Sequence, residues 1–133
     1  ACLPDADEEK AAQLQEKGVE VLRIPGVTTA DITEEQKEVI SLPVLMKELG
    51  ARKIDGILLE GGGQLNESAL QAGIVDRIYC YIAPKIFGGA QAKTPVEGQG
   101  LTRAADAWQF NRIGMQEFGQ DILLEYEKAQ ELQ

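Results

Sequence analysis

Hydrophobic and polar residues follow one another along the chain in a pattern that predicts helices and strands in alternation. Residues 4–17 carry acidic side chains at the front and end before a glycine, which are the start and stop signals of a helix. Residues 19–24 (VEVLRI) alternate in part, contain β-branched side chains and stop at a Pro-Gly pair, so they predict a strand. Residues 28–40 are polar and predict a loop, which includes a helical turn that begins near Asp31.

The middle of the chain continues the alternation. A Ser-Leu-Pro opening predicts a helix over residues 41–49, with Ser as the N-cap and Pro in the first turn. Residues 54–60 (IDGILLE) form a short, largely apolar run, which is typical of a strand covered on both faces. A glycine triplet follows, then residues 64–72 predict a helix closed by a glycine, and residues 75–83 (VDRIYCYIA) predict a strand.

The last third of the chain predicts a long loop over residues 87–102 and two strands, 107–117 and 121–128, joined by a tight turn. This order of elements predicts an α/β fold: a mixed sheet flanked by helices, with a C-terminal β hairpin. The first helix has no strand before it, although a parallel crossover needs one on each side, so we expect the sheet to be incomplete at the N-terminus. No repeat or linker divides the sequence, and we treat residues 1–133 as part of a single domain.

Composition narrows the classes of function. The 133 residues carry 13 Lys and Arg against 22 Asp and Glu, a net charge of −9, which disfavours nucleic acid or an anionic membrane as a partner. His is absent, so this chain has no imidazole base and no His metal ligand. Cys2 and Cys80 lie far apart, which predicts two reduced thiols rather than zinc or a redox dithiol, and no metal is expected. With no signal-peptide pattern and no apolar run of about 18 residues, we expect a cytoplasmic protein.

The residues that could bind a ligand or take part in a reaction lie where the apolar run 54–60 ends. Glu60 is followed by Gly61, Gly62 and Gly63, and then by Gln64 and Leu65 at the start of the next predicted helix. Glycines let a backbone approach a ligand and adopt positive φ, and a helix N-terminus attracts anions. The spacing matches neither GxGxxG nor GxxxxGK[ST], so the turn is either an anion-binding loop or simply a tight strand-to-helix connection. Glu60 is either partly desolvated and set to bind substrate hydroxyls, or a solvated residue at a strand end.

The residues around this turn resemble a known family. The string DGILLEGGGQLNESALQAGIVDRIYCYIAPKIFGG (residues 55–89) is similar to the reductase domain of bifunctional riboflavin-biosynthesis proteins, the 5-amino-6-(5-phosphoribosylamino)uracil reductases. The matching segments are Glu60-Gly61-Gly62, Leu65–Ala69, Gly73–Asp76, Ile82–Lys85 and Gly88-Gly89, with weaker matches at Leu14–Leu22 and Leu42–Gly50.

The resemblance implies a dihydrofolate-reductase-like fold and hydride transfer from NADPH to the ribosyl C1 of 5-amino-6-(5-phosphoribosylamino)uracil. It also implies that Gly61–Leu65 hold the NADPH pyrophosphate and that Glu60 faces the nicotinamide and the substrate ribose. The family has a longer front portion, and the segment expected near the adenosine 2′-phosphate, residues 1–7, is acidic and lacks Lys and Arg. A homodimer or higher homo-oligomer is expected. The alternatives are another NADPH-dependent reductase of the same fold, or a non-catalytic assembly domain.

Overall fold

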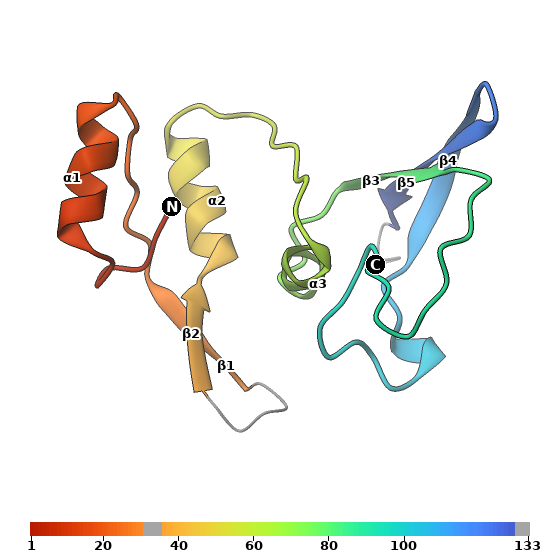
Figure 1. Cartoon of the computed structure of the whole chain (residues 1–133), viewed down its shortest axis with the longest axis horizontal. Helices are drawn as coiled ribbons and strands as arrows, with labels where there is room; N and C mark the ends of the chain where they lie inside the picture. The colour runs from red at the N-terminus through yellow and green to blue at the C-terminus, as the bar shows by residue number, and fades with distance from the viewer. Residues whose placement is uncertain (31–35, 130–133) are drawn as a thin grey trace. The chain divides into compact units, whose positions relative to one another are not determined.

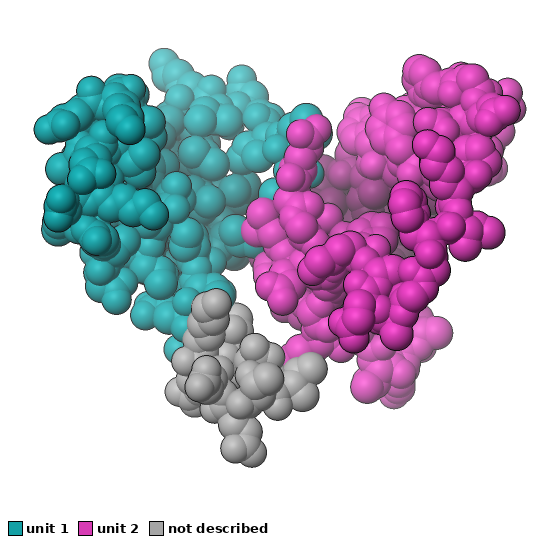
Figure 2. Space-filling view, in the orientation of Figure 1, with its two compact units in different colours: residues 1–59 teal, residues 60–133 magenta. Residues whose placement is uncertain are grey.

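The computed structural model describes residues 1–30 and 36–129, and the chain divides into two compact units, Ala1–Leu59 and Glu60–Gln133 (Figures 1 and 2). The assignment of residues 1–133 to one domain stays a prediction. None of the helices among the described residues is both long enough and apolar enough to cross a membrane.

The first unit opens with helix α1 (Glu8–Glu16), which confirms the predicted first helix with a later start. Asp7 is the N-cap, and its carboxylate accepts a hydrogen bond from the backbone N–H of Lys10 at 3.1 Å. This bond satisfies one of the free N–H groups of the first turn and so defines where the helix begins. The helix ends before Gly18, which adopts a left-handed φ of +80°.

The predicted strand over residues 19–24 is wrong. In its place there is a single parallel bridge between Cys2 and Arg23. The N–H of Cys2 donates to the carbonyl of Leu22, and the N–H of Ile24 donates to the carbonyl of Cys2, both at 2.9 Å. A strand needs a paired neighbour, and the short segment ahead of α1 supplies only one paired residue. The sequence predicted no strand before the first helix, and in the structure Cys2 alone pairs there, through this one bridge.

Residues predicted as a loop form a β hairpin instead. Strand β1 (Gly26–Ala30) pairs with β2 (Gln36–Ile40) in antiparallel register, with Gly26 opposite Ile40. Valine, isoleucine and threonine in these strands favour extended backbone even though the segment is polar overall. The helical turn expected near Asp31 lies outside the described residues.

Helix α2 (Leu42–Ala51) confirms the predicted second helix, with Pro43 in its first turn. Ser41 occupies the N-cap position and is buried, but its side chain makes no capping hydrogen bond. Its backbone N–H instead donates to the carbonyl of Pro25 at 2.9 Å, which joins the hairpin to the helix.

The predicted strand over residues 54–60 is also wrong: this segment is extended chain without strand pairing. Its apolar side chains are exposed, and Leu58 is 74% accessible. A strand buried on both faces exists only where neighbouring strands and covering helices are present, and the described residues of this unit provide neither for this run.

Over residues 60–129, the second unit contains one α-helix and a three-stranded antiparallel sheet (Figure 1). The helix is α3 (Gly63–Gln71), and the strands in chain order are β3 (Arg77–Ile82), β4 (Phe110–Phe118) and β5 (Asp121–Lys128). β5 lies between β3 and β4, so the C-terminal hairpin forms most of the sheet. The predicted helix and three strands are confirmed, with small shifts of their bounds.

The connections of the second unit also follow the sequence pattern. Residues 87–102 form neither helix nor strand, as predicted, and a short 3-10 turn, η1 (Ala104–Asp106), follows them. The tight turn between β4 and β5 contains Gly119 at a φ of +65°, a backbone conformation that favours glycine. A register shift in β4 between Arg112 and Gly114 marks a β-bulge.

The apolar core is small in each unit. Ala11 and Ile24 are buried in the first unit, and Ala69, Leu70 and Leu123 are buried in the second.

The sheet of the second unit leaves aromatic side chains accessible. Tyr81 is 67% exposed and Phe118 is 52% exposed, and their ring centroids lie 6.2 Å apart. Among the described residues, β3 and β4 each pair on one side only, so the sheet is open at both edges.

Candidate functional site

The glycine triplet leads directly into helix α3. Gly62 is the N-cap residue, with φ −74° and ψ 168°, and Gly63 is the first helical residue. The N–H of Asn66 donates to the carbonyl of Gly62 at 3.1 Å, which is the first hydrogen bond of the helix. The backbone N–H groups of Gly63, Gln64 and Leu65 therefore have no acceptor within the helix and lie at its positive end. Such a turn can hold a phosphate-like anion.

The three glycines have different neighbours. A Cβ on Gly61 would lie 2.6 Å from the Leu65 side chain, and a Cβ on Gly63 would run into the Glu97 side chain. A Cβ on Gly62 would meet nothing within 4 Å. None of the three has a positive φ, so this turn does not use the left-handed conformation that glycine permits. Gly61 and Gly63 make room for side chains of the protein, whereas Gly62 alone of the three faces open space.

Glu60 lies immediately before this turn and is exposed. Of the two alternatives for Glu60, the exposed position agrees with a solvated carboxylate, and the strand at whose end it was expected does not form in the described chain. Glu60 is nevertheless close to the turn along the chain, because it lies two residues before the N-cap of α3. Its part in any reaction stays a prediction.

A loop that the sequence did not connect with the site is bound to the first half of α3. The side-chain amide of Asn66 donates to the carbonyl of Pro95 at 2.8 Å. The N–H of Glu97 donates to the carbonyl of Gly63 at 3.1 Å, and the N–H of Gly100 donates to the carboxylate of Glu67 at 2.6 Å. Residues 95–100 are therefore one border of the turn that opens α3.

Charges on this loop lie close to the turn. The side chain of Glu97 contacts Gly63, and its carboxylate pairs with the ammonium group of Lys93 at 3.7 Å. Lys93 is 91% exposed, so this pair is a solvated one with little net energy. An acid, Glu97, therefore lies at the border of the predicted anion site, with an exposed base, Lys93, paired to it.

Sequence reasoning missed Glu67. This residue is only 7% exposed, although it lies in the middle of an amphipathic helix beside the buried Ala69 and Leu70. A carboxylate on the apolar side of a helix was a signal in the sequence, because a buried charge requires hydrogen-bond donors. Its partner, Gly100, is distant along the chain, and no local pattern connects the two.

The acidic segment ahead of α1 has no Lys or Arg of its own, but in the structure it binds a cation from elsewhere in the chain, the guanidinium of Arg23. The guanidinium of Arg23 donates to the carbonyls of Pro4 and Ala6, at 2.7 and 3.0 Å, and pairs with Glu8 at 2.8 Å. These bonds use the guanidinium to brace the loop. Arg23 therefore stabilises this segment rather than supplying an unpaired positive charge to it.

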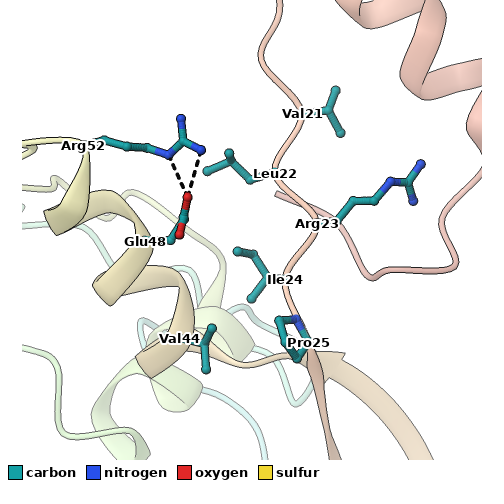
Figure 3. A pocket seen from close by; sticks show the side chains of 8 residues that line it. All are labelled: Val21, Leu22, Arg23, Ile24, Pro25, Val44, Glu48 and Arg52. Carbon is teal, nitrogen blue, oxygen red and sulfur yellow. Dashed lines mark hydrogen bonds and ion pairs between the residues drawn. The ribbon is translucent and has the colours of Figure 1, made fainter.

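A cavity of about 360 Å³ lies in the first unit, between the segment 21–25 and helix α2 (Figure 3). The guanidinium of Arg52 at its rim donates to Glu48 at 2.8 Å and also to Glu20. The hydrogen bond with Glu48 is the main cause of a raised pKa for Arg52. Because two acids surround Arg52, the cavity presents little net positive charge. None of the predicted site residues lines this cavity.

A second cavity, of about 520 Å³, lies at the C-terminal end of α3 in the second unit. Trp108 and Phe110 line it, together with Lys128, whose ammonium group donates to the carbonyl of Gly73 at 3.1 Å. Both aromatic side chains are half-buried. None of the residues 60–65 lines this cavity. Over the part of the chain that the structure describes, no cluster of three or more Cys, Asp or Glu could hold a metal ion.

Comparison with known proteins identifies what the chain is similar to. The family model described as the RibD C-terminal domain matches residues 3–124. The chain is 41% identical over 120 residues to riboflavin biosynthesis protein RibD of Actinobacillus pleuropneumoniae, covering 90% of the chain and 30% of that protein. It is 38% identical over 87 residues to 2,5-diamino-6-ribosylamino-4(3H)-pyrimidinone 5′-phosphate reductase of Methanothermobacter thermautotrophicus, covering 65% of the chain and 40% of that protein.

Two solved structures share the fold. RibD of Acinetobacter baumannii matches with a TM-score of 0.62 and 26% identity over 70% of this chain and 26% of the other. A pyrimidine reductase-like protein of Corynebacterium diphtheriae matches with a TM-score of 0.65 and 24% identity over 98% of this chain and 49% of the other. The mixed α/β arrangement described above is therefore the arrangement found in RibD reductase structures. The chain spans less than half the length of each of these relatives.

Proposed function

Because the chain belongs to the RibD C-terminal domain family, we propose that it forms part of the reductase of a riboflavin-biosynthesis enzyme. The proposed reaction is the NADPH-dependent reduction of 5-amino-6-(5-phosphoribosylamino)uracil to its ribitylamino form. The observation that carries the proposal is the match over residues 3–124, which includes the whole glycine turn at the start of α3. The proposed fold of the complete domain is dihydrofolate-reductase-like, acting in the cytoplasm.

The residues at the start of α3 fit one phosphate-bearing part of NADPH. Gly62 has open space before it, and the N–H groups of Gly63, Gln64 and Leu65 lie free of helix hydrogen bonds at the positive end of the dipole. Gly61 belongs to the same turn, where it leaves room for the Leu65 side chain. Backbone donors of this kind attract a pyrophosphate even in a chain whose net charge is −9.

When bound, NADPH would supply the hydride that reduces C1 of the ribosyl group. The ring C–O bond at C1 breaks, the ring oxygen takes a proton, and a ribityl chain results. The role proposed for Glu60 is to accept hydrogen bonds from ribose hydroxyls and so to orient C1 toward the nicotinamide. Correct orientation of two reactants lowers the barrier without any change in the chemistry of the cofactor.

Two related substrates deserve direct comparison. The Methanothermobacter relative is named for a substrate with an additional amino group on the pyrimidine, 2,5-diamino-6-ribosylamino-4(3H)-pyrimidinone 5′-phosphate. The reductase proposed here takes the uracil form, which has a carbonyl group at that position. Turnover of each compound by the complete protein would separate the proposed function from that of another reductase of the same fold.

The turn itself can be tested with Gly62→Val in the complete protein. An added side chain in the open space before α3 blocks the approach of a pyrophosphate, so the Kd for NADPH should rise by about tenfold or more, or about 1.4 kcal/mol. Gly50→Val is a matched control, because Gly50 lies in α2 and a Cβ there also meets nothing within 4 Å. Isothermal titration or cofactor fluorescence gives the Kd. Equal affinity in both variants would reject the turn as the cofactor site, and no binding in any form would favour an assembly domain.

A further inference from the structure

We propose that Glu67 is a positioning residue, which holds residues 95–100 against the first turn of α3 and thereby shapes the cofactor site. The proposal rests on the proposed function, because the site in question is the NADPH site at Gly62–Leu65. Nothing in the reaction itself requires Glu67 to touch the substrate or the cofactor. Its effect is through the loop.

The first argument is the burial of the carboxylate. Glu67 is 7% exposed and accepts a 2.6 Å hydrogen bond from the N–H of Gly100. A buried carboxylate is stable only where donors replace the water that it has lost. The loop is therefore an obligatory partner of this side chain, and the carboxylate is in turn the acceptor for the backbone of the loop.

The second argument is the backbone of the loop itself. Gly98 and Gly100 have φ values of +86° and +64°, in the left-handed region that favours glycine. A Cβ on Gly98 would overlap the carboxylate of Glu67. The two glycines let the chain curve closely around the carboxylate, so both the side chain and the loop are shaped for this contact.

The third argument is the position of the loop relative to the turn. Two other hydrogen bonds, from Asn66 to Pro95 and from Glu97 to Gly63, fix the same loop to the same helix. With the loop in this place, the Glu97 side chain lies on Gly63 and leaves Gly62 open. If the anchor at Glu67 is lost, we expect the Glu97 carboxylate to become free to move in front of the turn. A negative charge there opposes a phosphate group.

The experiment uses Glu67→Gln and Glu67→Ala in the complete protein, with three readouts. Hydrogen exchange of the backbone amides of residues 98–100 measures anchoring directly, and we expect exchange to become faster by about tenfold or more in Glu67→Ala. Titration measures the Kd for NADPH, which should rise by about tenfold in Glu67→Ala and by less in Glu67→Gln, because glutamine keeps an acceptor oxygen. The KM for NADPH should rise while kcat changes by less than about threefold.

Ser68→Ala is the matched control. Ser68 is the next residue of the same helix, is exposed, and donates to the carbonyl of Gln64 rather than to the loop. It should leave the exchange of residues 98–100 and the Kd unchanged. If Glu67→Ala does not fold, Glu67→Gln still gives all three readouts, and we expect a smaller but measurable increase in exchange, because a neutral amide oxygen is a weaker acceptor than a carboxylate.

Each outcome is decisive. Unchanged exchange at residues 98–100 in a folded Glu67 variant would overturn the anchoring role. Faster exchange with an unchanged Kd would overturn the connection between the loop and the cofactor. Absence of NADPH binding by the unaltered protein would instead overturn the proposed function, and with it the connection to the cofactor, while the exchange measurement would still decide the anchor.

Discussion

The glycines at 61, 62 and 63 are chemically identical, but the side chains around them give each a different role. Gly61 is contacted by Leu65 and Gly63 by Glu97, whereas no atom lies within 4 Å of the place where a Gly62 side chain would begin. Substitution at Gly63 therefore affects packing, and substitution at Gly62 affects what can approach from outside. Stability and binding can be separated by two changes of equal size at neighbouring residues.

We expect Gly63→Ala to lower the free energy of unfolding by about 1–3 kcal/mol, since the new methyl group must displace the Glu97 side chain. Gly62→Ala should cost less, about 0.5–1 kcal/mol, because its methyl group enters open space at a φ that alanine adopts readily and the loss is only that of a poorer N-cap. Urea denaturation of the two variants provides the comparison. Equal losses of stability would mean that Glu97 moves away at little cost.

The proposed role of Glu60 makes a prediction about turnover rather than stability. Glu60→Ala in the complete protein should lower kcat for the phosphoribosylaminouracil substrate by about tenfold or more, or about 1.4 kcal/mol of barrier, because alanine has no oxygen to accept hydrogen bonds from the ribose. Because Glu60 is exposed, its change should leave the melting temperature nearly unaltered. Asp55→Ala is the control, since Asp55 is also an exposed carboxylate of the preceding segment. A loss below about threefold would leave Glu60 without a catalytic role.

The candidate site could be located from the sequence but not completed. Residues 60–65 stand out because a carboxylate, three glycines and a helix start are adjacent in the chain, and adjacency is what a sequence displays. Glu67 and Gly100 are 33 residues apart, and their contact depends on how the intervening loop folds. The distinct neighbours of the three glycines are equally invisible, because they too come from side chains elsewhere along the chain.

At the scale of elements, helix α1 depends on a local signal that can be removed. Asp7→Ala deletes the side-chain acceptor for the N–H of Lys10 and should cost about 1 kcal/mol of helix stability. Thermal unfolding, followed by circular dichroism, measures the loss. Asp7→Asn should retain most of the stability, because asparagine is an equally good N-cap. If alanine and asparagine behave alike, the cap contributes little to this helix.

Whether the sequence predicted each of the other elements depends on whether its determinants are local or distant along the chain. Helices α1, α2 and α3 were predicted because caps, prolines and apolar spacing all lie within the helix or next to it. Strands β4 and β5 were predicted because a tight turn at Gly119 makes their pairing local. The runs 19–24 and 54–60 have strand-like sequences without strand partners among the described residues, and the polar hairpin of β1 and β2 was missed because its pairing compensates for a weak pattern.

At the scale of the whole molecule, large apolar side chains remain accessible in both units. Ile86 and Phe87 are 99% and 92% exposed, Leu58 is 74% exposed, and Tyr81 on strand β3 is 67% exposed. Isolated exposed hydrophobic residues are normal on a protein surface. An open strand edge with apolar side chains is different, because the free N–H and C=O groups of β3 offer pairing to another strand.

These features favour self-association, opposed by a net charge of −9. We therefore expect the chain to form dimers or larger oligomers, more strongly as salt rises to about 0.15 M, where charge repulsion is screened beyond about 8 Å. Tyr81→Lys places a charge on the open edge and should shift the population toward the monomer in sedimentation velocity. Gln15→Lys adds the same charge at an exposed position of helix α1, away from any strand edge, and serves as the control. If both lysine variants shift the population equally, net charge and not the β3 edge governs association. A chain that stays monomeric at high concentration and high salt would contradict the prediction altogether.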